Sequence, residues 1–293
     1  MDRRDFLKAG TVGAAALGLP EPAAAGARAP GNYRYRLSLA AYSMRKYLDL
    51  KNPTLTLEQF VDKCGDWGFD GAELTEYYFP KPISAEYVSK LKRAALRNGL
   101  AVTGTPIGNS FTHPAGEARD REITKVKQWI DVSGDLGSPV IRIFAGSAPK
   151  GTEEGVARKY VVECIEACLP HAAKRGVVLA LENHGGVVAT AEGMLEILKA
   201  LRSEWVGANV DTGNFHTEDP YAEIEKIVPY AATVQVKTEM SAQGKRFEAD
   251  LPRLVEMFRK AGYKGFITLE YEAAEEPLQA IPRHLEALRK LTS

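Results

Sequence analysis

The chain has 293 residues, and its 38 Lys and Arg balance 38 Asp and Glu, so its formal charge is zero. A content of 45% hydrophobic residues is typical of a folded globular protein and excludes a disordered chain. The charge balance argues against a nucleic-acid-binding protein, because such proteins carry a basic excess that neutralises phosphates. Three Cys residues cannot form a disulfide framework, and we expect Cys164 and Cys168, one helical turn apart, to be small buried groups.

The first 25 residues have the three parts of an export signal. Arg3 and Arg4 precede an uncharged stretch from Ala9 to Leu19, and small residues up to Ala27 offer cleavage sites. The apolar stretch is shorter than the roughly 20 residues that span a bilayer, so no stable membrane anchor is expected. The Arg pair resembles the twin-arginine signal, with Asp2 where Ser or Thr is usual. We therefore predict a twin-arginine-type signal peptide at residues 1–25, a linker at 26–34, and export to the periplasm.

The twin-arginine resemblance carries a chemical implication, because that export machinery moves proteins that have already folded. A protein that needs a weakly held metal gains from loading it before export, since raw affinity favours copper and zinc over manganese or magnesium.

Residues 35–293 alternate short apolar runs with stretches of helical spacing, such as Leu57, Phe60, Val61 and Cys64. Several of these stretches end in Gly, as at Gly68 and Gly176, which tolerates the left-handed turn that closes a helix. The predicted strands are Arg36–Ser43, Gly71–Thr75, Ala101–Thr105, Val140–Phe144, Val177–Glu182, Val206–Asp211, Thr233–Lys237 and Phe266–Glu270.

Alternation of strand and helix predicts a parallel sheet with right-handed crossovers. Eight units favour a single-domain (β/α)8 TIM barrel over an open doubly wound sheet. The open fold would need a Gly-rich phosphate loop after an early strand, and the segment Gly104–Gly108 is a poor substitute for one.

Polar side chains end four consecutive predicted strands, at the edge where barrel enzymes place their chemistry. Side chains alternate along a strand, so apolar residues can face the helices while Glu182, Asp211, Gln235 and Glu270 point inward. Buried carboxylates would repel one another unless a cation lies among them. Oxygen donors suit a hard divalent ion, Mn²⁺ or Mg²⁺ first and Zn²⁺ as an alternative.

A simpler interpretation applies to each acid taken alone, since a single acid at a strand end often caps a helix or pairs with a base. Lys237 and Arg142 could pair with these acids without any catalytic role. Four such positions in consecutive units are harder to explain in this way.

The pattern of strand-Glu182, strand-Asp211-x-Gly-Asn214, strand-x-x-Lys237 and strand-Glu270 resembles the xylose-isomerase-like TIM-barrel superfamily over essentially the whole mature chain. Ketose epimerases of this superfamily usually have His at the position of Gln235, and a Gln there resembles the hydroxypyruvate isomerase branch instead. The endonuclease IV branch uses additional His ligands for three zinc ions, and Asn214 stands where one would be expected.

The resemblance implies a metal-dependent sugar isomerase or epimerase that moves a proton through an enediolate. Glu182 and Glu270 would serve as base and acid while also touching the metal, together with Asp211 and Gln235. Candidates for binding the carbohydrate substrate are His184, Lys237, Glu73 and Arg142, each with a structural role as the alternative.

Two other functions remain open from the sequence. A carbohydrate lyase would use the same proton abstraction to expel a glycosidic group, and an extracytoplasmic location favours it because free sugar phosphates are scarce there. A non-catalytic carbohydrate-binding barrel is disfavoured because both acid/base residues are present.

Overall fold

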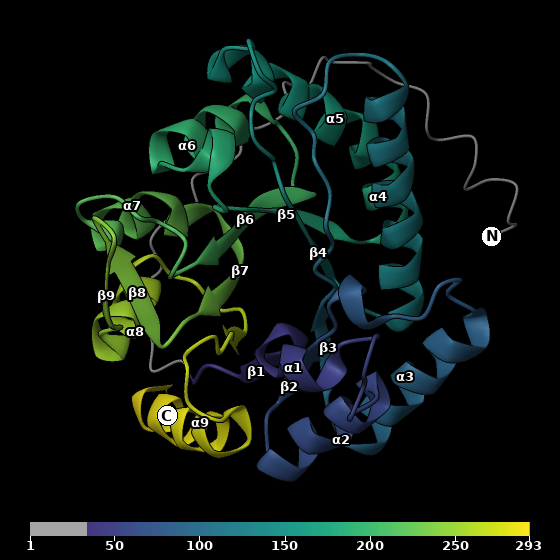
Figure 1. Ribbon diagram of the computed structural model, residues 1–293, viewed down its shortest axis with the longest axis vertical. Coiled ribbons are helices and arrows are strands. Elements are labelled where there is room, and N and C mark those ends of the chain that lie inside the picture. Colours follow the sequence, from purple (N-terminus) through teal and green to yellow (C-terminus); the bar gives the residue numbers. More distant parts are fainter. Residues whose placement is uncertain (1–33, 293) are drawn as a thin grey trace, which may run out of the picture.

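The computed structural model describes residues 34–292, so the predicted signal peptide at 1–25 and almost all of the linker lie outside the described residues. An eight-stranded parallel sheet curls into a barrel, and helices surround it (Figure 1). The barrel strands are β1 (Leu37–Ala40), β2 (Gly71–Glu73), β3 (Ala101–Gly104), β4 (Val140–Ile143), β5 (Val178–Glu182), β6 (Val206–Asp211), β7 (Ala231–Val236) and β10 (Ile267–Leu269).

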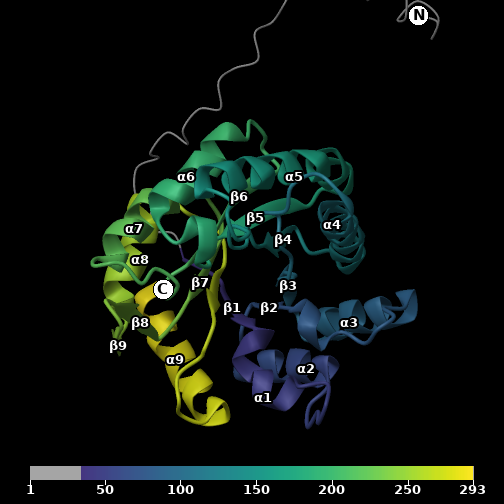
Figure 2. The ribbon, with the colours of Figure 1, turned by 45° about the horizontal axis from the view of Figure 1, so that its top comes forward.

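The strand order is β3-β2-β1-β10-β7-β6-β5-β4, so the first strand of the barrel pairs with its last. The remaining seam, between β3 and β4, is joined just beyond the end of β3. There the amide of Thr105 donates to the carbonyl of Val140, and the amide of Ile107 donates to that of Arg142, both at 3.1 Å. The predicted single-domain (β/α)8 barrel is therefore confirmed, with its seam visible beside β4 in Figure 2.

Helices cover the outer face of the barrel, and Thr56, Ser84 and Thr190 cap three of them with their hydroxyl groups. The predicted stop at Gly68 is confirmed by its φ of 82°, a left-handed conformation that closes the helix. The helices are α1 (Arg45–Leu48), α2 (Leu57–Trp67), α3 (Ala85–Arg97), α4 (Glu117–Leu136), α5 (Glu154–Arg175), α6 (Ala191–Ala200), α7 (Pro220–Ile227), α8 (Leu251–Lys260) and α9 (Pro277–Thr292). Within residues 34–292, none of the helices is long and apolar enough to cross a membrane.

Side-chain alternation divides the barrel into an apolar outer layer and a polar interior. On β7, Val234 and Val236 belong to the main apolar core, whereas Gln235 between them is hydrogen-bonded to polar side chains. Cys164 and Cys168 are buried as predicted. The interior is therefore where the polar strand residues meet.

Two features differ from the sequence prediction. The first strand ends at Ala40 instead of Ser43, because the chain turns into a 3₁₀ helix, η2 (Ala41–Met44). After β7 an antiparallel hairpin, β8 (Glu239–Ala242) and β9 (Lys245–Glu248), stands beside the mouth of the barrel. Its turn uses Gln243 and Gly244, both with positive φ.

Candidate functional site

The four side chains predicted to gather inside the barrel lie at adjacent strand ends. Asp211 on β6 is in register with Gln235 on β7, and both side chains are completely buried. Glu182 ends β5 beside β6, and the amide of Glu270 donates to the carbonyl of Val236 on β7 at 2.9 Å. The sequence prediction of a buried polar centre from four consecutive strands therefore agrees with the fold.

Lys237 connects the acids of this centre. Its Nζ lies 3.0 Å from Asp211 Oδ2, 3.3 Å from Glu270 Oε2 and 2.8 Å from Glu272 Oε1. It also donates to the side-chain oxygen of Asn214 at 3.0 Å. Burial alone would lower the pKa of Lys237, but the surrounding carboxylates raise this pKa well above its ordinary value. Lys237 is therefore a charged ammonium between two of the predicted metal ligands.

Glu182 is held from two sides. Its Oε2 lies 2.7 Å from Nε of Arg142, and its Oε1 accepts a 2.8 Å hydrogen bond from Asn214. Arg142 in turn donates from Nη1 to the carbonyl of Ile107 at 2.7 Å, across the barrel seam. Burial raises the pKa of Glu182, while the Arg142 guanidinium opposes this rise. Asn214 thus links Glu182 to Lys237.

A second chain of hydrogen bonds crosses the interior from β7 to β2. Gln235 donates from Nε2 to Glu73 Oε1 at 2.7 Å, and its Oε1 accepts from Asn209 at 2.6 Å. Burial, together with repulsion from Glu270, raises the pKa of Glu73 to about 8. Burial also raises the pKa of Glu270 to about 8 against the attraction of Lys237. Both carboxyls therefore hold a proton at neutral pH in this arrangement.

The donor chemistry of this centre fits a hard divalent cation. Carboxylates outnumber the two cations around it, and burial, with a smaller part from their mutual repulsion, raises the pKa values of these acids. Among residues 34–292, however, no three His, Cys, Asp or Glu side chains are arranged to hold a metal ion. The side-chain contacts give the reason: Lys237 lies between Asp211 and Glu270, and Arg142 engages Glu182. The oxygen donors are present, and they form ion pairs with Lys237 and Arg142.

The candidate substrate-binding residues lie at two levels of the site. Glu73, Arg142 and Lys237 belong to the buried centre. Glu73 contacts the side-chain amide of Gln235, and the two cationic side chains contact the acids. His184 is exposed at the rim, where its ring lies 4.5 Å from that of Phe144, measured between ring centroids. Its backbone amide donates to the carbonyl of Glu182 at 3.0 Å, but within the described chain its ring forms no hydrogen bond or ion pair with the four predicted ligand side chains.

Sequence reasoning missed several polar side chains around the centre. Glu272 lies two residues beyond Glu270, so strand alternation could have placed it on the same side. Asn214 was visible in the Asp-x-Gly-Asn segment but was not assigned a contact. Arg246 lies on the unpredicted hairpin, and no sequence signal connected it with the site.

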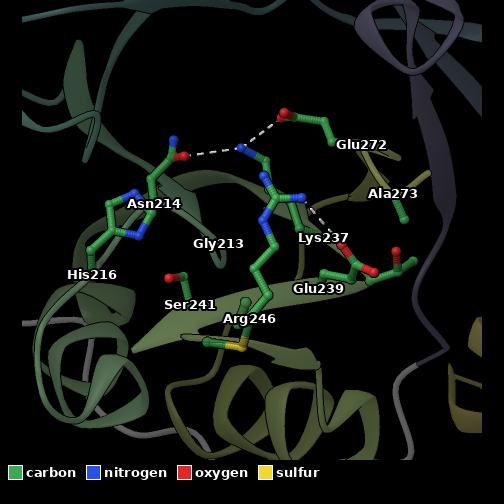
Figure 3. A pocket seen from close by; sticks show the side chains of 11 residues that line it. Gly213, Asn214, His216, Lys237, Glu239, Ser241, Arg246, Glu272 and Ala273 are labelled. Atoms are coloured by element: carbon green, nitrogen blue, oxygen red, sulfur yellow. Dashed lines mark hydrogen bonds and ion pairs between the residues drawn. The ribbon is translucent and has the colours of Figure 1, made fainter. Parts of the chain in front are cut away.

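A polar cavity of about 250 Å³ opens beside Lys237, and we call it the inner cavity. Figure 3 shows Lys237 between Asn214 and Glu272 on one side of it. The same view shows Arg246 reaching into the cavity from the hairpin, paired with Glu239. A ligand entering from the mouth would meet these groups before the buried acids.

A profile of the xylose isomerase-like TIM barrel family matches residues 61–291, and the chain belongs to this family. The expectation of an isomerase agrees with this family. A profile of the twin-arginine translocation pathway signal sequence matches residues 1–20, which supports the predicted export.

Individual relatives are distant. A Homo sapiens protein named "Putative hydroxypyruvate isomerase" is 25% identical over 251 residues, covering 75% of this chain and 86% of the relative. The fold is similar to that of a 3-keto-D-glucoside 4-epimerase from E. coli (TM-score 0.68, 17% identity, 88% of this chain and 100% of that chain). It is also similar to that of a xylose isomerase-like barrel protein from Mycobacterium smegmatis in complex with magnesium (TM-score 0.68, 14% identity, 89% and 96%).

Proposed function

We propose that the protein is a divalent-metal-dependent isomerase or epimerase of sugars or sugar derivatives, acting by proton transfer through an enediolate. The observation that carries the proposal is the gathering of Glu182, Asp211, Gln235 and Glu270 at adjacent strand ends inside the barrel. Membership of the xylose isomerase-like family supports it, and so does the magnesium complex of a structurally similar protein.

The four side chains would hold the ion through carboxylate and amide oxygens, which favours Mn²⁺ or Mg²⁺ and also permits Zn²⁺. When bound, the ion supplies Lewis-acid polarisation of the substrate carbonyl. Gln235 is already oriented by its bonds to Asn209 and Glu73, so its amide group is fixed before any ligand arrives.

Glu182 and Glu270 are the proposed acid/base pair. The Arg142 guanidinium 2.7 Å from Glu182 favours the ionised form of this carboxyl, which is the form a base requires. Glu270, whose Oε2 lies 3.3 Å from Nζ of Lys237, is the proposed partner that handles the second proton transfer. Proton movement between adjacent carbons interconverts aldose and ketose, whereas return of the proton to the opposite face of one carbon gives an epimer.

The remaining side chains would bind the substrate. Lys237 carries a positive charge close to where negative charge develops on the substrate oxygen, and it can stabilise that charge. Glu73 can accept hydrogen bonds from sugar hydroxyls at the floor of the site. His184 at the rim would contact the part of the sugar nearest the solvent.

Proton exchange in deuterated water tests the proposed reaction. The mature chain, loaded with Mn²⁺, is incubated with keto-sugars and keto-glycosides, and products are followed by NMR. We expect deuterium at the carbon beside the carbonyl, with the sugar skeleton intact. Glu182→Gln should lose this exchange and bind Mn²⁺ more weakly. Full metal content and full exchange in that variant would contradict the assignment.

A lyase acting on keto-glycosides is the second candidate function. It is favoured by the predicted export and by the similarity in fold to an enzyme that acts on a 3-keto-D-glucoside. The same incubation separates the candidates, because a lyase releases the aglycone while an isomerase does not. Binding without exchange or release would leave only a carbohydrate-binding barrel.

A further inference from the structure

A second cavity, of about 340 Å³, adjoins the inner cavity at the mouth of the barrel, and we call it the outer cavity. The two share Arg246, Glu272 and Ala273 in their walls, so a ligand can extend from one to the other past the small side chain of Ala273. The outer cavity is bounded on its other side by Arg45 and Lys46 of α1. Single-ligand pockets are typically about 300–1,000 Å³, so the two cavities together suit a ligand longer than one sugar ring.

Each acid that lines the outer cavity forms an ion pair with a cation outside its wall, although Lys237 shares its charge among Glu272, Asp211 and Glu270. Glu272 pairs with Lys237 at 2.8 Å, and Glu275 pairs with Arg283 through both guanidinium nitrogens. The one lysine in the wall, Lys46, forms an ion pair with Glu276. These pairs leave the two arginines to set the charge of the cavity.

Arg45 forms no ion pair among residues 34–292, although its charge helps Lys237 to lower the pKa of Glu272. It donates from Nη1 to the carbonyl of Tyr271 at 3.1 Å and from Nη2 to that of Glu272 at 3.3 Å. Its guanidinium also lies 5.2 Å from the centre of the Tyr42 ring. These neutral contacts orient the positive charge and do not cancel it.

Arg246 stands on the wall between the two cavities. Its only ion pair within the described chain is with Glu239, at 3.8 Å, and 79% of its side chain is exposed. An exposed pair at that distance contributes little, so a better partner can replace Glu239 at low cost. A planar guanidinium binds a carboxylate through two parallel hydrogen bonds, which gives both affinity and orientation.

We propose that the outer cavity is a carboxylate-binding subsite formed by Arg45 and Arg246, and that the substrate is an acidic glycoside with a uronic acid unit. This inference rests on the proposed function for the position of the reacting ring, which lies in the inner cavity beside Lys237. The acidic ring then extends past Ala273 to the two arginines. A carboxylate is favoured over a phosphate because the protein carries an export signal and sugar phosphates are scarce outside the cytoplasm.

Calorimetric titration of the Mn²⁺-loaded mature protein tests this subsite with three probes: cellobiose, cellobiouronic acid and cellobiose phosphorylated on the same outer ring. We expect cellobiouronic acid to bind about tenfold more tightly than cellobiose, as charge-assisted hydrogen bonds allow, and added salt to reduce the difference. Equal affinities, no binding of the acid, or tighter binding of the phosphate would each overturn the proposal.

Substitution at the wall between the cavities gives the matched test. Arg246→Gln should remove most of the preference for the acidic disaccharide, measured as the ratio of its affinity to that for cellobiose, because the exposed guanidinium contributes charge to the subsite and little packing. The control is Arg121→Gln on α4, where the arginine side chain is 64% exposed and lies outside both cavities, so that the full preference should remain. A preference that survives in Arg246→Gln contradicts the subsite.

These tests distinguish failure of the subsite from failure of the proposed reaction. If the acid preference depends on Arg246 but no sugar exchanges deuterium, the isomerase proposal fails and the subsite stands. If deuterium exchange occurs with neutral sugars and the acid preference is absent, only the subsite fails.

Discussion

Lys237 lies where the charge balance of the buried centre calls for a cation. Its ammonium contacts Asp211 and Glu270, two of the proposed metal ligands, and also reaches Glu272 at the open side. A divalent ion and this ammonium would therefore compete for the same carboxylate oxygens. Glu272 and Asn214 offer the lysine another position when an ion is bound.

Lys237→Met separates two effects of Lys237: competition with a bound ion, and stabilisation of the acids when no metal is bound. We expect the variant to bind Mn²⁺ about tenfold more tightly than the parent protein, because no positive charge opposes the ion. Without metal, the free energy of unfolding should fall by about 3 kcal/mol, because buried acids lose their partner. Calorimetric titration and urea unfolding in chelator measure the two effects. Lys226→Met, which breaks an exposed pair with Glu223, should change neither, and weaker Mn²⁺ binding by Lys237→Met would refute the competition.

Stability of the metal-free protein should decline between about pH 5 and pH 8. Glu73 and Glu270 have folded-state pKa values of about 8, above their values in the unfolded chain, so the folded state binds more protons over this range. Each group then lowers the free energy of unfolding by up to about 1.4 kcal/mol per pH unit as pH rises.

Urea unfolding at several pH values in the presence of chelator measures this slope. Glu73→Gln should make the slope shallower, because one of the two titrating carboxyls is gone while its hydrogen bond to Gln235 can be kept. An unchanged slope in that variant would mean that Glu73 does not titrate in this range. Saturating Mn²⁺ should also flatten the profile, since bound metal keeps the acids ionised.

The sequence located the four strand-end residues but not their partners. Strand alternation and parallel pairing are sufficient to bring Asp211 and Gln235 together. Which base pairs with which acid depends on side-chain reach in three dimensions, as for Arg142, which extends from β4 to Glu182 on β5. The same limit explains why Asn214 was seen in the sequence without its contacts.

Among the elements, the turn after β5 forms part of the rim of the site and contains two adjacent glycines. Gly185 and Gly186 both have positive φ, at 60° and 54°. A Cβ on Gly186 would overlap the carbonyl oxygen of Gly146 in the loop after β4, whereas a Cβ on Gly185 would meet nothing within 4 Å. The two positions therefore share backbone strain and differ in steric room.

Alanine at each glycine tests this difference. Gly185→Ala should cost about 1 kcal/mol, from the left-handed backbone alone. Gly186→Ala should cost about 2 kcal/mol more, because the loops after β4 and β5 must separate. Urea unfolding measures both values, and similar losses in the two variants would contradict the close approach. His184 on the same turn should move in Gly186→Ala, which weakens sugar binding there.

The hairpin β8–β9 shows where element prediction reached its limit. Eight barrel strands were predicted because each is a compact apolar run next to a helical stretch. The hairpin has Met240 as its one buried apolar side chain, with the partly buried Phe247 opposite it, and most of its other residues are polar, so no apolar run marks it. Its turn at Gln243 and Gly244 gives only a weak hairpin signal.

For the molecule as a whole, the alternation of strands and helices predicted the barrel. Only the structure shows how the barrel closes. Pairing of β1 with β10 is regular, whereas the seam between β3 and β4 is bridged by bonds from loop residues beyond β3, such as Thr105 and Ile107, and by Arg142. A single sequence carries no pattern for such a seam, because the bonds involve loop residues that lack strand periodicity.

Removal of residues 266–293 tests how far export depends on the complete barrel. The shortened chain lacks β10, α9 and Glu270, so β1 loses one of its two strand partners. We expect it to remain in the cytoplasm and to be degraded, since unpaired strand edges and exposed apolar surface favour aggregation. Fractionation and immunoblotting of a tagged chain measure this. A shortened chain recovered in the periplasm at parent levels would contradict the expectation.

The pairing of β1 with β10 also determines when the barrel can finish folding. The residues of β1 leave the ribosome long before Ile267–Leu269 are synthesised, and the partner that completes the ring follows every other barrel strand in the chain. Until then the proposed metal site has the oxygen donors of β5 to β7 but lacks the carboxylate of Glu270. Completion of the ring, and with it of the proposed metal site, thus follows synthesis of every other barrel strand, and a transport route that accepts folded proteins suits that order.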